Sequence, residues 1–425
     1  MTNNPVGISD LSLYVPDPVI ELETLVDYRL KESPALERRL RRAIDSTGQR
    51  AIRYPQLWED SATLSAQAAH QLLERRDPAG LAGMRYLAVG TETGLDHSKP
   101  ISAYVEGMLQ AAGLAVPESI STFQVQHACA GGTISMLSVG ALLQVSGRSG
   151  ESGMVICSDI ARYDAPSTAE ITQGAGAVAM MIEPNPALIE LDLQTQGYAS
   201  RDVDDFFRPL GSVTAKVKGG YSVQCYNEAF DLAFLDHCDR LGQSPEDVLQ
   251  QTDVFALHVP FYKMAITALH RLVSKHTGMQ TDQFEQFMAE RGFLKGIEAA
   301  SRLGNIYSGA AYAALLFSLA DRYREFGSEI VGKRVLIGSY GSGNTMTVVG
   351  GCIAERAPQV IEGWDLDAVW RSQAALPVSN YETWMNAPYP PEEYRALMAQ
   401  AKVPQGRYYL CDIRDDGYRE YRFNG

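Results

Sequence analysis

Strand-like and helix-like segments alternate along this chain of 425 residues, which predicts an α/β fold. Hydrophobic residues make up 45% of the chain, so we expect one large globular body built from two closely packed halves. A run of Gly-X-Gly followed by an apolar stretch occurs twice, at 173–183 and at 340–350. Gly-X-Gly is common in turns, but the similar place of the two runs predicts a weak internal duplication.

In the first half, a strand is expected at 6–15, and a helix at 62–75 follows the start signal Glu59-Asp60-Ser61. The strand expected at 85–90 runs directly into Thr91-Glu92-Thr93. The remaining expected elements are a helix near 98–112, a strand at 120–126, a helix from about 134 to 145, and strands at 154–158 and 177–182.

The second half repeats this alternation. A strand at 254–258 ends on His258, and a helix at 263–274 follows it. A long amphipathic helix is expected to begin at Asn305, and strands are expected at 335–339 and 345–349, on either side of a glycine-rich turn.

Charge and composition exclude several classes of protein. The formal net charge of −14 argues against nonspecific nucleic-acid binding and against docking on an anionic membrane. No apolar run approaches the roughly 20 residues that span a bilayer, and the polar start MTNNPVGISD lacks the apolar core of a secretory signal. None of the six cysteines pairs at metal-ligand spacing, so we expect reduced thiols, a cytoplasmic protein and no metal site.

Cys129 lies in the run QVQHACAGGT, between an expected strand and an expected helix. A thiol at a helix N-terminus feels the positive end of the helix dipole, which favours the thiolate. The small residues Ala130, Gly131 and Gly132 let a substrate approach the sulfur and leave backbone N–H groups available to an oxyanion. These features favour a nucleophile over the alternative of a buried structural cysteine.

Three reactive side chains, Glu92, Cys129 and His258, follow the ends of expected strands, where functional groups gather in α/β folds. Together they suit acyl-thioester chemistry, because a cysteine can take an acyl group, a glutamate can remove a proton alpha to a thioester carbonyl, and a histidine can donate to a carbonyl oxygen. Alternatives remain for two of them: Glu92 could stabilise a helix start, and His258 could be a core histidine. A Cys/His dyad with His127 is the rival mechanism.

Taken together, these residues resemble the 3-hydroxy-3-methylglutaryl-CoA (HMG-CoA) synthase family of the thiolase-fold superfamily. VGTET with Glu92 is similar to the general-base segment, HACAGGT with Cys129 to the nucleophile segment, and HVPFYKM with His258 to the catalytic-histidine segment. The other matching segments, in family order, are SDIARY (158–163), TQGAGAVAM (172–180), DVDDFFRP (202–209), GGYSVQCY (219–226), GNIYSGAAY (304–312) and SYGSG (339–343). TGQRAIR (47–53) resembles the entry region of the wider ketosynthase III-type group.

The resemblance implies a duplicated thiolase-like fold layered α-β-α-β-α, with an N-terminal half (1–190) that carries Glu92 and Cys129 and a C-terminal half (191–425) that carries His258. It also implies a homodimer. Cys129 would accept acetyl from a thioester, Glu92 would deprotonate the acetyl methyl group, and the carbanion would attack an acetoacetyl thioester whose keto oxygen His258 polarises. Hydrolysis would then release a 3-hydroxy-3-methylglutaryl thioester. Acyl-CoA or acyl-carrier-protein thioesters would be substrates, with no further cofactor.

The resemblance further assigns substrate contacts to Asn305, Ser342, Gly343 and Tyr221, and it suggests that Lys263 meets the pantetheine phosphates, against the alternative of a surface lysine. One departure is Ala130, because the family commonly has a tyrosine after the nucleophile; the acyl pocket therefore differs here.

Three alternatives to a CoA-using enzyme stay open. The first is the branch that adds β-branches to polyketides on acyl carrier proteins, although VPFYKM looks more like the CoA-using form. The second is a ketosynthase III-type enzyme, which would need Cys, His and Asn but no glutamate. The third is a non-catalytic scaffold, which would not need to retain all three reactive residue types.

Overall fold

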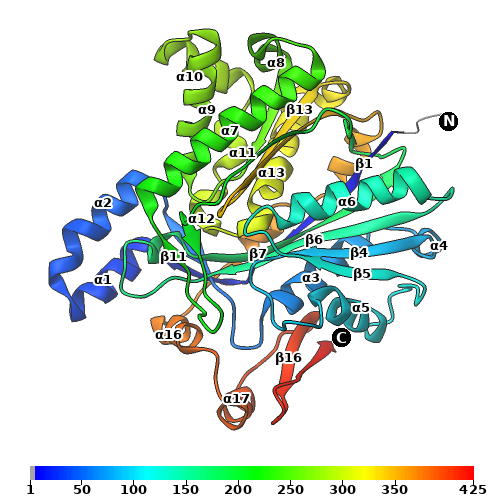
Figure 1. Cartoon of the computed structure of the whole chain (residues 1–425). Coiled ribbons are helices and arrows are strands. Elements are labelled where there is room, and N and C mark those ends of the chain that lie inside the picture. Colours follow the sequence, from blue (N-terminus) through cyan, green and yellow to red (C-terminus); the bar gives the residue numbers. More distant parts are fainter. Residues whose placement is uncertain (1–4) are drawn as a thin grey trace.

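The computed structural model describes residues 5–425, apart from the side chain of Ala79. Its centre is a mixed sheet of ten strands (Figure 1), in the order β12-β13-β14-β8-β1-β7-β6-β4-β5, with β9 paired to β14. The strands are β1 (Val6–Tyr14), β4 (Met84–Gly90), β5 (Ser121–Val125), β6 (Ser152–Ala161), β7 (Gly174–Pro184), β8 (Ile189–Leu191), β9 (Gly197–Ser200), β12 (Thr252–Leu257), β13 (Arg334–Gly341) and β14 (Thr345–Ile353). Every strand expected from the sequence is present.

The strand directions bring particular carboxyl ends together. β4 runs parallel to both β5 and β6, with Gly90 opposite Val125 and Cys157, so the residues that follow these three strands share one edge of the sheet. In the other half, β12 runs parallel to β13. The two Gly-X-Gly runs lie on antiparallel pairs, β6–β7 and β13–β14, as the weak duplication predicts.

Helices cover both faces of each half of the sheet. The long helices are α3 (Ser61–Leu73), α5 (Ile101–Ala111), α6 (Gly131–Ser146), α7 (Gly219–Leu241), α9 (Tyr262–Thr277) and α13 (Ala310–Phe326). A central core joins α6 and α13 to inward-facing residues of both halves, such as Val155 of β6 and Val254 of β12. The alternate residues Ile156 and Phe255 face two outer cores, one with α3 and α5 and the other with α7 and α9.

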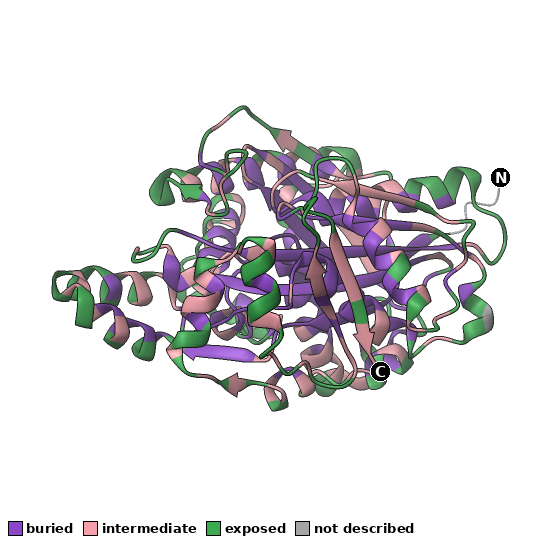
Figure 2. Cartoon of the chain, turned by 90° about the horizontal axis from the view of Figure 1, so that it is seen from below, coloured by how far each residue is buried: buried purple, intermediate pink, exposed green. Residues whose placement is uncertain are grey.

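The two halves of the sheet therefore form two β layers, with α6 and α13 between them and the other long helices outside. This is the layered α-β-α-β-α arrangement that the family resemblance implies. Strand alternation explains it, because neighbouring residues of one strand must find apolar partners on opposite faces. Figure 2 shows buried residues concentrated in the sheet and exposed ones at the periphery.

Helix α6 corrects the expectation that no apolar run could span a bilayer, because the segment Ala128–Ser146 is long and apolar enough, by length and composition, to cross a membrane. In the structure α6 packs against β4 and β6, and 56% of this segment is buried. Its apolar character is therefore that of a core helix.

Smaller elements surround this body. They are β2 (Pro18–Glu21), α1 (Leu22–Glu32), α2 (Glu37–Thr47), β3 (Ala51–Arg53), α4 (Pro78–Leu81), β10 (Phe206–Phe207), β11 (Lys216–Val217), α8 (Pro245–Gln251), α10 (Thr281–Glu290), α11 (Phe293–Ile297), α12 (Ala300–Leu303), α14 (Ala357–Glu362), α15 (Ala368–Arg371), β15 (Ala374–Ala375), α16 (Val378–Asn386), α17 (Pro391–Met398), β16 (Arg407–Ile413) and β17 (Arg419–Asn424). The terminal hairpin β16–β17 returns to pack on α3 and α5 of the first half.

The start of the long helix of the second half differs most from expectation. The long helix does not begin at Asn305, because the Asn305 side chain accepts a hydrogen bond from the backbone N–H of Tyr307 (2.8 Å), and Tyr307 has a left-handed φ of 43°. A short 3-10 turn at Tyr307–Gly309 follows, and α13 starts at Ala310.

Candidate active site

The thiol of Cys129 and the carboxylate of Glu92 lie in contact, with Cys129 Sγ 3.4 Å from Glu92 Oε1. The parallel pairing of β4 and β5 explains this, because Glu92 follows β4 and the cysteine turn follows β5. Ala128, with a φ of 42°, makes the sharp turn that places Cys129 just before the first turn of α6. The predicted position of the cysteine at a helix start is confirmed.

Gly90 sets the distance between β4 and the start of α6. A Cβ atom at this position would lie 2.1 Å from the backbone nitrogen of Gly132. Only a residue without a side chain therefore allows α6 to approach the end of β4 closely enough for the cysteine and the glutamate to meet.

Asp159, at the end of β6, holds the turn that carries Glu92. One carboxylate oxygen accepts hydrogen bonds from the backbone N–H of Glu92 (2.9 Å) and from the hydroxyls of Thr91 (2.9 Å) and Thr93 (2.8 Å). The other accepts from the backbone N–H of Ser308 (3.1 Å), at the turn before α13. Sequence reasoning missed Asp159, although it satisfies the same strand-end criterion that identified Glu92.

This environment raises the pKa values of both Glu92 and Cys129. Burial, together with the negative charge of Asp159, raises the pKa of Glu92 to about 8. Burial and the neighbouring carboxylates of Glu92 and Asp159 raise the pKa of Cys129 well above its usual range. The expected thiolate is therefore wrong for the free enzyme: desolvation and two carboxylates outweigh the helix dipole, and the thiol stays protonated at neutral pH.

An aromatic cluster encloses the sulfur. Cys129 is 7% exposed and packs in a core cluster with Tyr163, Phe206 and Tyr307. The ring centroid of Phe206 lies 6.4 Å from that of Tyr163 and 5.7 Å from that of Tyr307. The Tyr307 hydroxyl is buried next to Tyr163. The sulfur is thus largely enclosed by side chains.

His258 directly follows β12 and is 4% exposed. Its backbone N–H donates to the carbonyl of Gly338 on β13 (2.8 Å), and its carbonyl accepts from the Tyr226 hydroxyl (3.1 Å). The end of β13 in turn packs on the cysteine turn, since a Cβ at Gly341 would lie 2.8 Å from that of Ala130. Burial lowers the pKa of His258 to about 3, so the ring is neutral at physiological pH.

The rival dyad with His127 is not formed. In the described part of the chain the Cys129 thiol bonds to Glu92, and no hydrogen bond joins it to an imidazole. Burial also lowers the pKa of His127.

The other residues that the sequence predicts to contact substrate lie at several separate places in the structure. Ser342 and Gly343 line a cavity of about 630 Å³ together with Glu92 and Ala128, and Asn305 is buried in the turn before α13. Lys263 is exposed and donates to the backbone carbonyl of Asp45 (2.7 Å). Tyr221 is 40% exposed, in the first turn of α7.

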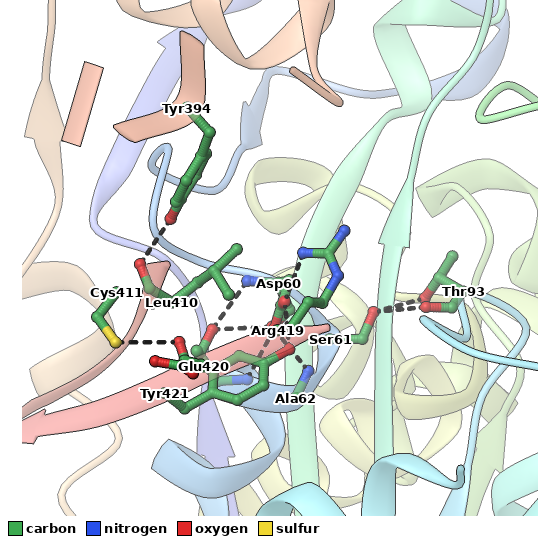
Figure 3. A network of polar contacts seen from close by, with 11 residues as sticks. Asp60, Ser61, Ala62, Thr93, Tyr394, Leu410, Cys411, Arg419, Glu420 and Tyr421 are labelled. Carbon is green, nitrogen blue, oxygen red and sulfur yellow. Dashed lines mark hydrogen bonds and ion pairs between the residues drawn. The ribbon is translucent and has the colours of Figure 1, made fainter. Parts of the chain in front are cut away.

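The C-terminal hairpin β16–β17 lines one side of this cavity through Leu410, Ile413 and Arg419. Asp60, the N-cap of α3, accepts hydrogen bonds from Arg419 (3.1 Å) and Tyr421 (2.8 Å) of β17, as Figure 3 shows. The next residue, Ser61, donates to the carbonyl of Thr93 (2.9 Å), so the network reaches the turn that carries Glu92.

Comparison with known proteins identifies the family. The N-terminal profile of hydroxymethylglutaryl-coenzyme A synthases matches residues 2–187, and the C-terminal profile matches residues 189–295 and 286–424. Hydroxymethylglutaryl-CoA synthase of Haloferax volcanii is 29% identical over 368 residues, which cover 77% of this chain and 81% of that protein. The mitochondrial enzyme of Homo sapiens is 29% identical over 379 residues, covering 80% and 71%.

Solved structures agree as well. MvaS in complex with 3-hydroxy-3-methylglutaryl coenzyme A superimposes with a TM-score of 0.84 at 31% identity, over 99% of both chains. The HMG synthase of the curacin biosynthetic pathway, in complex with holo donor-ACP, shares the fold with a TM-score of 0.83 at 21% identity, over 99% of this chain and 100% of that one. This chain therefore belongs to the hydroxymethylglutaryl-CoA synthase family of thiolase-fold acyltransferases, which condense an acetyl thioester with a β-ketoacyl thioester.

Proposed function

We propose that Cys129 carries the acetyl group, that Glu92 generates the carbanion, and that His258 polarises the keto oxygen of the acceptor. The observation that carries this assignment is the contact between Cys129 Sγ and Glu92 Oε1 at 3.4 Å in a part-buried site. A base so close to the sulfur would also be close to the methyl group of an acetyl thioester formed there.

In the first step the sulfur of Cys129 attacks the donor carbonyl, the bond to the donor sulfur breaks, and the released thiol leaves with a proton. Because the cysteine is protonated at neutral pH, this step needs a proton acceptor, and the ionised form of Glu92 can serve. The N-terminus of α6 adds a favourable field for the oxyanion.

In the second step Glu92 removes a proton from the acetyl methyl group, and the carbanion forms a carbon–carbon bond to the keto carbon of the acceptor. The keto oxygen becomes an alkoxide and takes up a proton as a hydroxyl, and the proton that Glu92 removed from the methyl group balances this uptake. The neutral ring of His258 suits this role, because a neutral imidazole can donate a hydrogen bond without adding a buried charge. Water then hydrolyses the enzyme thioester, which frees the cysteine and the product carboxylate.

For the carrier we propose coenzyme A, with a carrier protein as the second candidate. The 31% identity to MvaS, which was solved with 3-hydroxy-3-methylglutaryl coenzyme A, supports CoA. The similar fold of the curacin synthase, solved with a donor carrier protein, keeps the second candidate open. On the CoA assignment, Lys263, in the first turn of α9, would meet the phosphates, and Ser342, Gly343, Asn305 and Tyr221 would contact the substrate.

Mass spectrometry tests these roles directly. Acetyl-CoA should add one acetyl group to the wild-type protein and to the control Cys411→Ala, but none to Cys129→Ala. Glu92→Ala should still acetylate, although more slowly, yet lose roughly 10²-fold or more in condensation with acetoacetyl-CoA. Acetylation that survives Cys129→Ala would contradict the nucleophile assignment, and near-normal condensation by Glu92→Ala would contradict the base assignment.

We also propose that the enzyme is a homodimer of two-half subunits (1–190 and 191–425) in the cytoplasm. Strand β5 supports the dimer, because it ends the sheet and leaves one edge without a strand partner in the described chain. Such an edge invites pairing with a second copy. Sedimentation should show a dimer for wild type and a monomer for Thr122→Lys, since lysine on an edge strand opposes such pairing; a wild-type monomer would refute the proposal.

A further inference from the structure

A second cavity lies at the far end of helix α6 from Cys129. Its volume is about 520 Å³, which falls within the roughly 300–1,000 Å³ of small-molecule sites. Gln144, near the C-terminal end of α6, belongs to its wall, whereas Cys129 precedes the first turn of the same helix. With a rise of about 1.5 Å per residue, the two positions are about 22 Å apart along the helix. The cavity is therefore separate from the proposed catalytic site.

One wall of this cavity is a row of three residues on neighbouring strands. Arg334 of β13 is opposite Cys352 of β14, which is in turn opposite Glu190 of β8. All three line the cavity. Directly paired residues of antiparallel strands project to the same face of a sheet. A cation, a thiol and a carboxylate thus lie side by side, and the Cα atoms of the two charged residues are about 10 Å apart, the width of two strand spacings.

Both charges of this row are available to a ligand. Among residues 5–425, the Arg334 guanidinium and the Glu190 carboxylate have no hydrogen-bond or ion-pair partner; Arg334 uses only its backbone N–H, which donates to Asp253 (2.8 Å). Burial raises the pKa of the Cys352 thiol, the charge of Glu190 raises it further, and the charge of Arg334 lowers it. A ligand placed over Cys352 therefore meets a positive group on one side and a negative group on the other.

A buried histidine adds a hydrogen-bond acceptor. His237 of α7 lines the cavity, is 2% exposed, and has its Nδ1 2.5 Å from the carbonyl oxygen of Thr195. Because a carbonyl only accepts, Nδ1 carries the proton, and since burial lowers the pKa of His237, the neutral ring presents Nε2 as an acceptor. No described residue donates to Nε2. This atom lies over Gly350 in the cavity wall, where a Cβ would be 3.5 Å from it.

We propose that this cavity binds an α-amino acid with an apolar side chain. The ammonium group fits between Glu190, Asp192 and Nε2 of His237, which supply two negative charges and one acceptor. The carboxylate pairs with Arg334, because a planar guanidinium can donate to two oxygen atoms at once. The apolar part of the wall, which receives the side chain, includes Leu193, Leu241, Val248 and Leu336.

The two signs of charge select a zwitterion over simpler ions. A plain anion would pair with Arg334 but would be repelled by Glu190 and Asp192, and a plain cation would be repelled by Arg334. An amino acid satisfies both sides of the cavity, since its two charged groups are attached to one carbon. This site is additional to the proposed function and does not depend on the roles of Cys129 and Glu92.

Isothermal titration calorimetry with L-phenylalanine tests the site. Two matched probes each lack one charge: phenethylamine has no carboxylate, and 3-phenylpropanoate has no ammonium group. L-Phenylalanine should bind once per chain and about 10-fold or more tightly than either probe, the scale of one charge-assisted hydrogen bond. Cys129→Ala should bind it as wild type does, because the cavity lies at the other end of α6.

Two variants assign the charges. Arg334→Gln should weaken L-phenylalanine by about 10-fold and leave phenethylamine unchanged, because that probe has no carboxylate to lose. Glu190→Gln should weaken L-phenylalanine by a similar factor without weakening 3-phenylpropanoate. The matched controls are Arg271→Gln and Glu355→Gln, which lie outside the cavity wall and should change none of the probes. All four side chains are exposed, and the melting temperature of each variant without ligand verifies that it folds.

Three outcomes would overturn the proposal. The first is a folded wild type that binds none of L-phenylalanine, L-leucine and L-methionine at about 10 mM, a concentration that detects even millimolar affinity. The second is equal affinity for the three phenyl probes, or binding that neither charge variant weakens, which would show that only the apolar ring is held. The third is loss of binding in Cys129→Ala or displacement by acetyl-CoA, which would place the probe in the catalytic site. Each outcome leaves the proposed catalytic roles, which have their own tests, unaffected.

Discussion

At the scale of single residues, the burial of the Glu92 carboxyl determines the acid–base behaviour of the site. Its carboxylate lies 3.4 Å from a thiol, and the buried carboxylate of Asp159 holds its backbone N–H at 2.9 Å. Asp159 therefore fixes the position of Glu92 while it makes ionisation of Glu92 more costly. A base with a pKa of about 8 is better matched to proton abstraction from carbon than an ordinary carboxylate.

The raised pKa of Glu92 predicts a pH-dependent loss of stability. The unfolded chain ionises this group near pH 4.5, whereas the folded protein does so near pH 8, so stability is full below the first value and falls as pH rises toward the second. Glu92→Gln removes the titrating carboxyl and, with it, this pH-dependent contribution to stability. The melting temperature of the variant relative to wild type should therefore rise between pH 5 and pH 8 and then level off, while the exposed Glu355→Gln should show no such trend. A constant difference would contradict the assignment.

The same values predict the pH profile of condensation. The rate with preacetylated enzyme should rise with pH through about 8, as Glu92 ionises, and should show no inflection near 6.5, because His258 is neutral down to a pKa of about 3. Glu92→Asp should move the rise, whereas His258→Gln should lower the plateau without moving it. An inflection near 6.5 that disappears in His258→Gln would show instead that this imidazole titrates in the working enzyme.

At the scale of elements, the decisive contact is that between the end of β4 and the first turn of α6. Gly90 and Gly132 approach so closely that a Cβ on Gly90 would lie 2.1 Å from a backbone nitrogen, which no side-chain rearrangement can relieve. The register of β4 and β5 and this close approach together place the thiol against the carboxylate.

Gly90→Ala should therefore push α6 away from β4, lower the melting temperature and slow acetylation of Cys129. The control is Gly107→Ala in α5, where a Cβ meets no atom within 4 Å and where alanine should stabilise the helix by about 1 kcal/mol. Thermal melts and acetylation rates measure both variants. Normal acetylation by a folded Gly90→Ala protein would show that the turn can adjust and that the close approach is not required.

At the scale of the whole molecule, the C-terminal end of the chain returns to the N-terminal half. The C-terminal hairpin packs against α3 and α5, and Tyr408 of β16 lies in the outer core of the first half. Through Asp60, Ser61 and Thr93, this hairpin is hydrogen-bonded to the turn that carries Glu92 (Figure 3). The last residues of the sequence thus support the turn that carries Glu92.

The double variant Arg419→Met/Tyr421→Phe should leave the second carboxylate oxygen of Asp60 without its partners. Because an unpaired buried charge is costly, unfolding should become easier by about 3 kcal/mol, and the condensation rate should fall as the Glu92 turn loosens. Arg422→Met, on the same strand but exposed, is the control and should change neither quantity. Denaturant melts and rate measurements would decide, and an unchanged melt would show that Asp60 remains hydrated.

Much of this molecule was predictable from its sequence, because the features concerned are local. Strand alternation and helical periodicity located every expected strand, and the polar residues at strand ends identified Glu92, Cys129 and His258. The ordered motifs identified the family. The helix expected from Asn305 was misplaced, since its side chain bonds to the backbone of Tyr307 and stops the helix from starting there.

Only the tertiary structure decided how these groups behave. The thiolate expected from the helix dipole is suppressed by Glu92 and Asp159, which stand 37 and 30 residues away from Cys129 in the sequence and approach it only through strand pairing. The cavity walls likewise join Glu92 to residues beyond position 380. A sequence specifies residue types and local periodicity, whereas charge–charge distances, desolvation and the size of a cavity depend on contacts between distant segments, and these arise only when the chain packs.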